Sequence, residues 1–468
     1  MLFNSLEFVI FFPLVVAAFF LLPHKFRWAL LLAASCYFYM AFVPKYIVII
    51  LAIIFIDYFA AIFIERSAGK KRRWLVISTV SVNILILCVF KYYYFFVSDV
   101  NLLLNGSFSF PLVFLFPIGL SFQTFQALSY IFEVDKGTIK AERHIGIYAL
   151  YILFFPKQVA GPIERPQNMI PQFRQEKFFD SSRVLVGLKI ILWGFFKKLV
   201  IADRLAIFVG DAYRHPEDLG TLNLWIAVFI FFPVQLYCDF SGYTSIAIGS
   251  AKVLGFDLME NFKRPFLSLT ASEFWNRWHI SLSTWLRDYI YQPLVIALRD
   301  YGKWAVVIGL MVTFFVSGVW HGAGLSFIIY GLIQGTIIVV EFLLGIKSTK
   351  LAKSTFGRIR GITTTYLLWA FSLIFFRAKD LEQAMLIVNK MFWKVNLSFT
   401  PPVEIPVLNY ILSMLLIAFV LYFEGKKSDR FLYQRNTVAR DFALGCCMVV
   451  VLFTFGVFHN LSFIYFQF

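Results

Sequence analysis

Apolar stretches of about 20 residues, nearly free of charge, recur along this sequence and constrain its fold more than any other feature. In a helix, about 20 apolar residues span the hydrocarbon core of a bilayer. The sequence therefore predicts an all-α polytopic membrane protein, with spans that include residues 6–22, 46–64, 304–320, 325–344 and 408–423.

The composition supports burial in lipid rather than in the core of a soluble protein. The chain is 60% hydrophobic and 15% charged over 468 residues, whereas soluble domains average about 45–50% apolar and about 25% charged residues. No basic segment or small-residue cleavage site precedes Leu22. We therefore expect the first apolar stretch to be a retained span rather than a removed signal peptide.

The net charge of +16 resides mainly in short loops between the apolar stretches. Lys and Arg concentrate in cytoplasmic loops, near anionic lipid headgroups, so we expect contact with membrane lipids and no nucleic-acid binding. The basic loops at 65–73, 347–360 and 426–440 should be cytoplasmic. The loop at 98–111, which has no Lys or Arg, and the segment 377–406 should be outside, as should both termini. This alternation gives about eleven spans.

Two regions, 148–199 and 257–300, have apolar runs that are too short or too interrupted for simple spans. Such runs are often re-entrant or interfacial. Thr270 and Glu273 have the spacing of a capping box, which begins a helix. The spacing of five apolar residues then predicts one amphipathic helix, lying at the interface or dipping into a polar cavity, with Phe274, Trp278, Leu282, Trp285 and Tyr289 on one face.

Ionisable residues within spans are rare because they need a partner or a role. Asp57, Lys91 and Lys189 could snorkel or pair with one another, whereas His321 is the strongest candidate for chemistry. It follows an apolar span, in the segment 316–324, whose small residues allow close backbone approach and leave room beside the imidazole. A pKa of about 6.5 suits histidine to accepting and returning a proton. A purely structural histidine at a helix end is the alternative.

His279 is the second candidate for a buried histidine. Asp239 could join it as a metal ligand, but the sequence has no ligand-spaced pair of histidines, so we expect no metal. The five cysteines have neither disulfide nor metal-site spacing and should be small buried apolar residues. Solvated loops or span ends are expected for the remaining histidines, His24, His144, His215 and His459.

The motifs of several enzyme classes are absent. The sequence has no G-x-S-x-G, Walker loop or G-x-G-x-x-G, so a serine nucleophile, ATP-driven transport and nucleotide redox chemistry have no support. A histidine base that acts on an acceptor hydroxyl would suit transfer from an activated acyl thioester. The alternative is a polytopic transporter of lipids or small solutes, which should show two corresponding halves. The polar residues instead concentrate in one block, 239–321.

Ordered sequence blocks occur along nearly the whole chain. The strongest are EFWNRWHISLSTWLRDY at 273–289 and GVWHG at 318–322; the others include FPIGLSF at 116–122, VAGP at 159–162, GFFKKLVIAD at 194–203, DFSGYTSIAIG at 239–249 and ENFKRPF at 260–266. Together these blocks resemble the membrane-bound O-acyltransferase (MBOAT) family. The likeness is strongest to its bacterial branch of alginate O-acetyltransferases, which is related to the teichoic-acid D-alanylation membrane protein.

This resemblance implies a fold and a site. The fold would be a ring of about eleven transmembrane helices with re-entrant elements around a central tunnel, as a single membrane domain over residues 1–468. His321 would be the catalytic histidine, and His279 the second signature position, which could orient substrate. The substrate path would be lined by Asp239, Asn276, Arg277, Trp278 and Trp320.

The resemblance also implies the reaction and its location. An acyl donor, expected to be acetyl-CoA, would enter from the cytoplasmic side of the bacterial inner membrane, and no cofactor would be permanently bound. Segment 377–406 does not resemble an SGNH-type transferase, so a periplasmic or membrane-tethered SGNH-like partner is expected to deliver the group to an exported polysaccharide. Alginate, peptidoglycan, cellulose or another glycan would fit as acceptor, and acetyl is not distinguished from D-alanyl.

Overall fold

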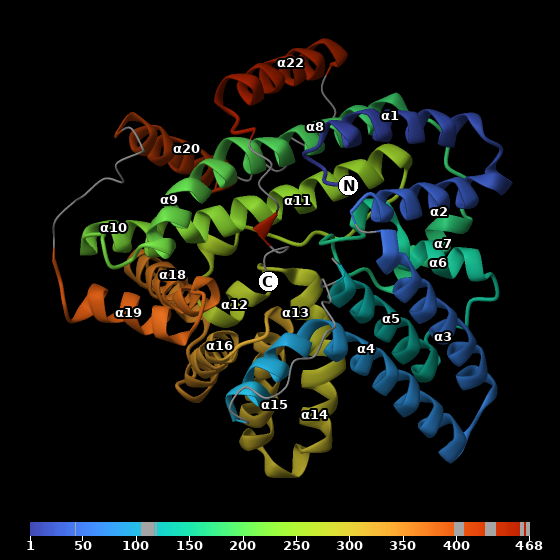
Figure 1. The fold of residues 1–468 in the computed structure, drawn as a ribbon, viewed down its shortest axis with the longest axis horizontal. Coiled ribbons are helices and arrows are strands. Elements are labelled where there is room, and N and C mark those ends of the chain that lie inside the picture. Colours follow the sequence, from blue (N-terminus) through green and yellow to red (C-terminus); the bar gives the residue numbers. More distant parts are fainter. Residues whose placement is uncertain are drawn as a thin grey trace. The chain divides into compact units, whose positions relative to one another are not determined.

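The computed structural model describes residues 1–42, 44–103, 117, 119–396, 407–425, 437–458 and 463–464. Throughout these residues the regular elements are helices (Figure 1), which confirms the all-α prediction. Seven helical segments in the described part are long and apolar enough to cross a membrane, and Leu6–Leu21 and Ile145–Lys157 are shorter apolar helices. Parts of the predicted loops at 98–111, 377–406 and 426–440, and His459, lie outside the described residues.

The chain divides into two compact units. The first comprises Met1–Ile191 and Ile246–Met259, and the second comprises Leu192–Ser245 and Glu260–Phe468. The single membrane domain with about eleven spans around a tunnel concerns the whole chain and stays a prediction.

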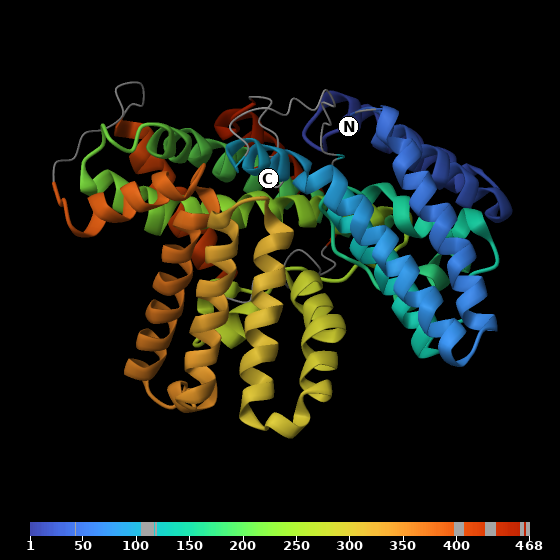
Figure 2. The same ribbon diagram turned by 60° about the horizontal axis from the view of Figure 1, so that its bottom comes forward.

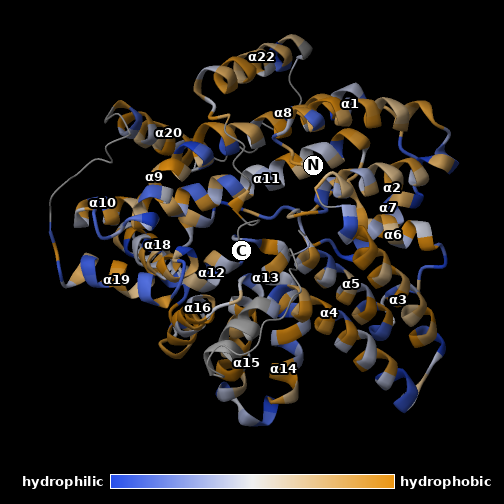
Figure 3. Cartoon of the chain, in the orientation of Figure 1, coloured by the Kyte–Doolittle hydropathy of each residue, from blue (hydrophilic) through white to orange (hydrophobic). Residues whose placement is uncertain are grey.

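The first unit begins with long apolar helices and continues with shorter ones. In Figure 3, α3 and α4 are apolar along most of their length, and the turn between them is hydrophilic. The two helix ends at this turn carry the basic cluster at residues 66–73 that the sequence assigns to the cytoplasmic side. The helices of this unit are α1 (Leu6–Leu21), α2 (His24–Met40), η1 (Pro44–Tyr46), α3 (Ile47–Arg66), α4 (Gly69–Leu103), α5 (Leu120–Lys136), α6 (Ile145–Leu153), η2 (Phe155–Lys157), α7 (Pro166–Arg174) and most of α8 (Ser181–Phe195).

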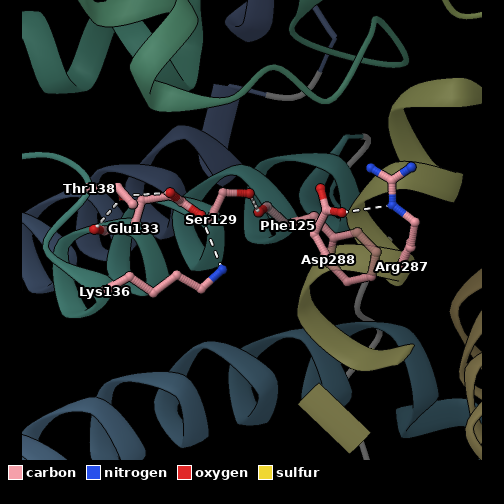
Figure 4. Close-up of polar contacts among 7 residues, drawn as sticks. All are labelled: Phe125, Ser129, Glu133, Lys136, Thr138, Arg287 and Asp288. Carbon is pink, nitrogen blue, oxygen red and sulfur yellow. Dashed lines mark hydrogen bonds and ion pairs between the residues drawn. The ribbon is translucent and has the colours of Figure 1, made fainter. Parts of the chain in front are cut away.

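Two acidic side chains of this unit form hydrogen bonds or ion pairs with residues nearby in the chain or on a neighbouring helix. Asp57 in α3 accepts a hydrogen bond from the side-chain amide of Asn83 in α4, at 2.8 Å. At the end of α5, Glu133 accepts from the Thr138 hydroxyl at 2.5 Å and pairs with Lys136 at 3.4 Å (Figure 4). Gly137 follows in the left-handed region, with φ of 74°, and so ends the helix.

The second unit combines long spans with a run of short helices. Figure 2 shows α15, α16 and α18 side by side, with the α16–α18 connection at one end. Region 257–300 begins with short elements, and its helical residues then continue without a break from Ile280 to Ala297. The helices are η3 (Phe196–Ala202), α9 (Asp203–Arg214), α10 (Thr221–Ile226), η4 (Ala227–Phe231), α11 (Phe232–Leu254, shared with the first unit), η5 (Pro265–Leu267), α12 (Ala271–Trp275), α13 (Ile280–Leu286), η6 (Arg287–Tyr291), α14 (Gln292–Ala297), η7 (Arg299–Tyr301), α15 (Lys303–His321), α16 (Leu325–Leu343), α17 (Ser348–Leu351), α18 (Thr355–Arg377), α19 (Leu381–Phe392), α20 (Val407–Gly425) and α22 (Val438–Phe455).

The prediction of one amphipathic helix from 273 to 289 is wrong. Thr270 caps the start as predicted, because its side chain accepts from the Glu273 N–H at 3.1 Å. However, α12 ends at Trp275, and α13 begins at Ile280. A passing segment takes the backbone groups that a continuous helix would use internally. Lys263 N–H donates to the Arg277 carbonyl, and Ile280 N–H donates to the Asn261 carbonyl, both at 2.9 Å.

Candidate functional site

His321 is the last residue of α15 and lies inside the second unit. Its side chain is 6% exposed. The imidazole packs edge-on against Tyr330 of α16 and Phe376 of α18, with ring centroids 5.9 and 5.3 Å away. The helix end therefore places this histidine where three spans meet.

Small residues bring α15 and α16 close together, as predicted for the segment around His321. A Cβ on Gly318 would lie 2.4 Å from the Phe327 carbonyl, and one on Gly331 would lie 2.3 Å from the Phe314 carbonyl. Gly322 is also in close contact, because a Cβ there would lie 2.2 Å from the Phe327 ring. The room that the small residues of this segment leave beside the imidazole stays a prediction.

His279 lies in the break between α12 and α13. Its φ of 44° places it in the left-handed region, and its side chain is fully buried. A positive φ is uncommon for residues other than Gly, although Asn, Asp and His adopt it more often than the rest. The predicted continuous helix would have left His279 beside its apolar face, whereas the break turns it into the interior.

Asn261 determines which nitrogen of His279 carries the proton. Ser281 donates its backbone N–H and its hydroxyl to Oδ1 of Asn261, at 3.1 and 2.9 Å, so this end of the amide is an oxygen. Nδ1 of His279 lies 3.2 Å from the same oxygen and therefore acts as the donor. The network thus assigns the proton to Nδ1 and makes Nε2 the acceptor nitrogen of a neutral ring.

The surroundings of His279 also favour the neutral ring. Burial, followed by the neighbouring His321, lowers the pKa of His279 well below its ordinary value. The rings of Phe240 and Trp320 lie against the imidazole, with centroids 4.6 and 6.2 Å away. Because Trp320 also contacts His321, with centroids 4.9 Å apart, it links the two histidines. The structure thus brings together His279, Trp320 and His321.

The other predicted residues of the 273–289 block lie outside this group. Trp278 stacks on Phe274 within an aromatic cluster. Asn276 is exposed and donates its amide to the Ser272 carbonyl at 2.9 Å. Arg277 forms an ion pair with Glu273, one turn earlier. Trp278 therefore anchors the chain on one side of the break, and Arg277 braces α12.

Asp239 belongs to a separate buried ion cluster that the sequence analysis missed. Nζ of Lys198 lies 2.6 Å from Asp239 and 2.8 Å from Asp203. The second oxygen of Asp239 accepts from the Ile464 N–H at 2.8 Å. Lys198 and Asp203 are five residues apart within GFFKKLVIAD, which is out of register for an α-helix. The π-helix η3 joins them through an Asp203 N–H to Lys198 carbonyl bond.

The remaining polar candidates occupy ordinary positions. His144 caps α6 by accepting from the Ile147 N–H at 3.2 Å. Cys238 is buried as predicted, whereas Cys446 and Cys447 are exposed on an apolar helix. Among the described residues, His215, Glu217 and Asp218 place ligand atoms within 4.8 Å of one another, but all three are exposed, and such groups often form without a metal.

Comparisons with known proteins match the part of the chain that contains both histidines. The model of MBOAT, the membrane-bound O-acyltransferase family, matches residues 141–386, which include both. A probable alginate O-acetylase AlgI of Pseudomonas syringae pv. tomato is 33% identical over 399 residues, covering 84% of this chain and 75% of the relative. A peptidoglycan O-acetyltransferase of Helicobacter pylori is 31% identical over 389 residues, with 77% and 73% covered. A teichoic acid D-alanyltransferase of Bacillus subtilis is 33% identical over 234 residues, with 47% and 58% covered.

Proposed function

Because this chain belongs to the membrane-bound O-acyltransferase family, we propose that it moves an acetyl group from cytoplasmic acetyl-CoA across the bacterial inner membrane. This acetyl group would be used to O-acetylate an exported or cell-envelope polysaccharide. The chain is a multi-pass membrane protein and an O-acyltransferase. The donor, the direction of transfer and the acceptor are the proposed parts.

The observation that carries this proposal is the buried group of His279, Trp320 and His321. In the proposed reaction, the His321 imidazole takes the proton of an acceptor hydroxyl as its oxygen attacks the thioester carbonyl carbon. The carbon–sulfur bond then breaks, and the proton passes from His321 to the departing thiolate. A neutral His279 would orient a reactant through Nε2, since Nδ1 is used by Asn261. No covalent acyl-enzyme is needed.

The relatives' names support an envelope polymer as the final acceptor. Two are named for O-acetylation of alginate and of peptidoglycan, and a third for D-alanylation of teichoic acid. We further propose that a separate SGNH-like protein outside the membrane receives the acetyl group. In segment 377–406, the described residues after α18 form only the short helix α19, which is too small for such a transferase domain.

The direction of transfer can be tested with sealed membrane vesicles and acetyl-CoA labelled in the acetyl group. Because CoA does not cross bilayers, inverted vesicles should transfer label to a lumenal acceptor, and right-side-out vesicles should not. Right-side-out vesicles that have been permeabilised should transfer label, which shows that their enzyme is active. Transfer from outside in sealed right-side-out vesicles would contradict the direction. Transfer of labelled D-alanine from a D-alanyl carrier protein, with no transfer of label from acetyl-CoA, would contradict the assignment of acetyl as the transferred group.

Substitutions at His279 should separate its backbone role from its side-chain role. Asparagine tolerates the left-handed region and keeps an amide near Nδ1 that can bond to Asn261. We expect His279→Asn to retain measurable acetyl transfer and His279→Ala far less, both at normal abundance. His279→Gly relieves the backbone strain without restoring a side chain. Activity in the glycine variant equal to wild type would show that only the backbone matters.

Asn261 provides an independent control for the same network. Asn261→Asp keeps the oxygen that accepts from Ser281 and His279, and its negative charge should raise the pKa of His279. Since activity requires neutral His279 in this proposal, rates fall as pH drops through that pKa. The acidic limb of the pH–rate profile should therefore move to higher pH. An unchanged pH–rate profile in a stable Asn261→Asp protein would contradict the proposal that Asn261 positions His279.

A further inference from the structure

A second feature of the second unit lies at the α16–α18 connection, away from the proposed reaction. A groove there has a volume of about 360 Å³, at the lower end of the range of about 300–1,000 Å³ that is usual for ligand sites. Its walls are mainly aliphatic, with threonine methyl and hydroxyl groups. They include Ile337 and Val340 of α16, Leu351 of α17, and Arg360, Thr364 and Leu368 of α18.

The groove opens on an apolar surface that we expect to face lipid. Helices α16 and α18 are both candidate membrane spans. Large apolar side chains beside the groove are highly exposed, among them Leu344 at 69%, Phe356 at 75% and Ile359 at 61%. A surface of this kind is stable in hydrocarbon and unfavourable in water. The occupant of the groove should therefore come from the membrane.

The rim of the groove is strongly basic. No Asp or Glu occurs between residues 342 and 379. The one acid that lines the groove, Glu341, accepts hydrogen bonds from the N–H groups of Ala271 and Ser272 at 2.7 and 3.1 Å. Five cations of the connection are exposed and form no ion pair within the described residues: Lys347, Lys350, Lys353, Arg358 and Arg360.

We propose that this groove binds a membrane phospholipid with an anionic headgroup. An acyl chain occupies the aliphatic groove, and the phosphate lies at Arg360 and the lysines of the connection. Positive charge at the membrane surface attracts anionic lipids of the cytoplasmic leaflet, and the basic connection is expected on that side. A soluble phosphate compound would satisfy the cations but leave the aliphatic walls uncovered.

The groove also touches the segment that leads to His279. Leu269 is part of its wall, and Glu341 caps the first turn of α12. Helix α12 ends four residues before His279. A lipid chain that packs against Leu269 therefore braces the beginning of α12.

The test uses the full chain in nanodiscs of phosphatidylcholine with a minority of phosphatidylglycerol. Native mass spectrometry after gentle release counts the lipids that remain bound. The wild type should retain phosphatidylglycerol in preference to phosphatidylcholine. Lys350→Gln with Arg360→Gln should lower this retention by about fivefold for each cation removed. The matched control, Lys379→Gln with Lys394→Gln, removes two exposed cations beyond the other end of α18 and should have no effect.

Two further arms distinguish the possible occupants. Thr364→Phe changes an exposed lining residue and should displace the lipid by filling the groove while keeping every charge. Added CoA should not compete with phosphatidylglycerol. Equal retention in the wild type and the Lys350→Gln/Arg360→Gln variant would overturn the proposal, as would displacement by CoA. Neither measurement requires acyl transfer, so the outcome is independent of the proposed function.

Discussion

Replacement of His321 by alanine should abolish acyl transfer and leave the protein in the membrane at normal abundance. Loss of a general base typically lowers the rate by about 10²–10⁴-fold. The ring is buried against Tyr330 and Phe376, so His321→Gln is a useful second variant that fills more of the space. Transfer from labelled acetyl-CoA in membranes measures the effect directly.

The matched control is His215→Ala. His215 belongs to the same unit but is exposed, so its loss should leave transfer unchanged. Thermal unfolding in detergent shows whether either variant has lost its fold. Near-normal polysaccharide acetylation in the His321→Ala strain would contradict the assignment of His321 as the base. If His321→Ala loses both its activity and its fold, the His321→Gln variant decides the matter. A folded but inactive His321→Gln protein would support His321 as the base.

Replacement of Lys198 by methionine should strongly destabilise the protein. Lys198 is 1% exposed and holds both Asp203 and Asp239. Removing one partner of a buried ion pair leaves uncompensated charge and costs about 3–5 kcal/mol. We expect a much lower midpoint of thermal unfolding in detergent and lower abundance in the membrane. Adding Asp203→Asn and Asp239→Asn to the same chain should recover most of the loss.

The same cluster tests the predicted role of Asp239 in the substrate path. If the carboxylate only pairs with Lys198 and accepts from Ile464, then Asp239→Asn should lower stability and leave the rate per folded molecule nearly unchanged. Lys252→Met provides the control, because its ion pair with Asp257 is solvent-exposed and such pairs contribute little. A stable Asp239→Asn protein with a greatly reduced rate would support the substrate-path prediction instead.

Local patterns in the sequence were sufficient for the helical membrane class. The thickness of the hydrocarbon core sets the length and the apolar character of each span separately. Each span can therefore be recognised from its own run of apolar residues. The helix cap at Thr270 was likewise predictable, because its hydrogen bond joins two residues that are three apart in the sequence. The sequence pattern named His321 and His279 as candidates, and the resemblance implied their roles. Their burial around Trp320 is consistent with that expectation, and their roles await the variants above.

Tertiary structure alone decided how the site is built. The periodicity from Phe274 to Tyr289 predicts a continuous helix, but Asn261 and Lys263 take its backbone bonds and turn His279 inward. Lys198 meets Asp203 only because a π-helix shifts the register, and Asp239 joins them from another helix. Buried polar groups must find partners, and in a low-dielectric interior an unpaired group costs more than a broken helical pattern. Those partners come from distant segments, which local sequence periodicity does not encode.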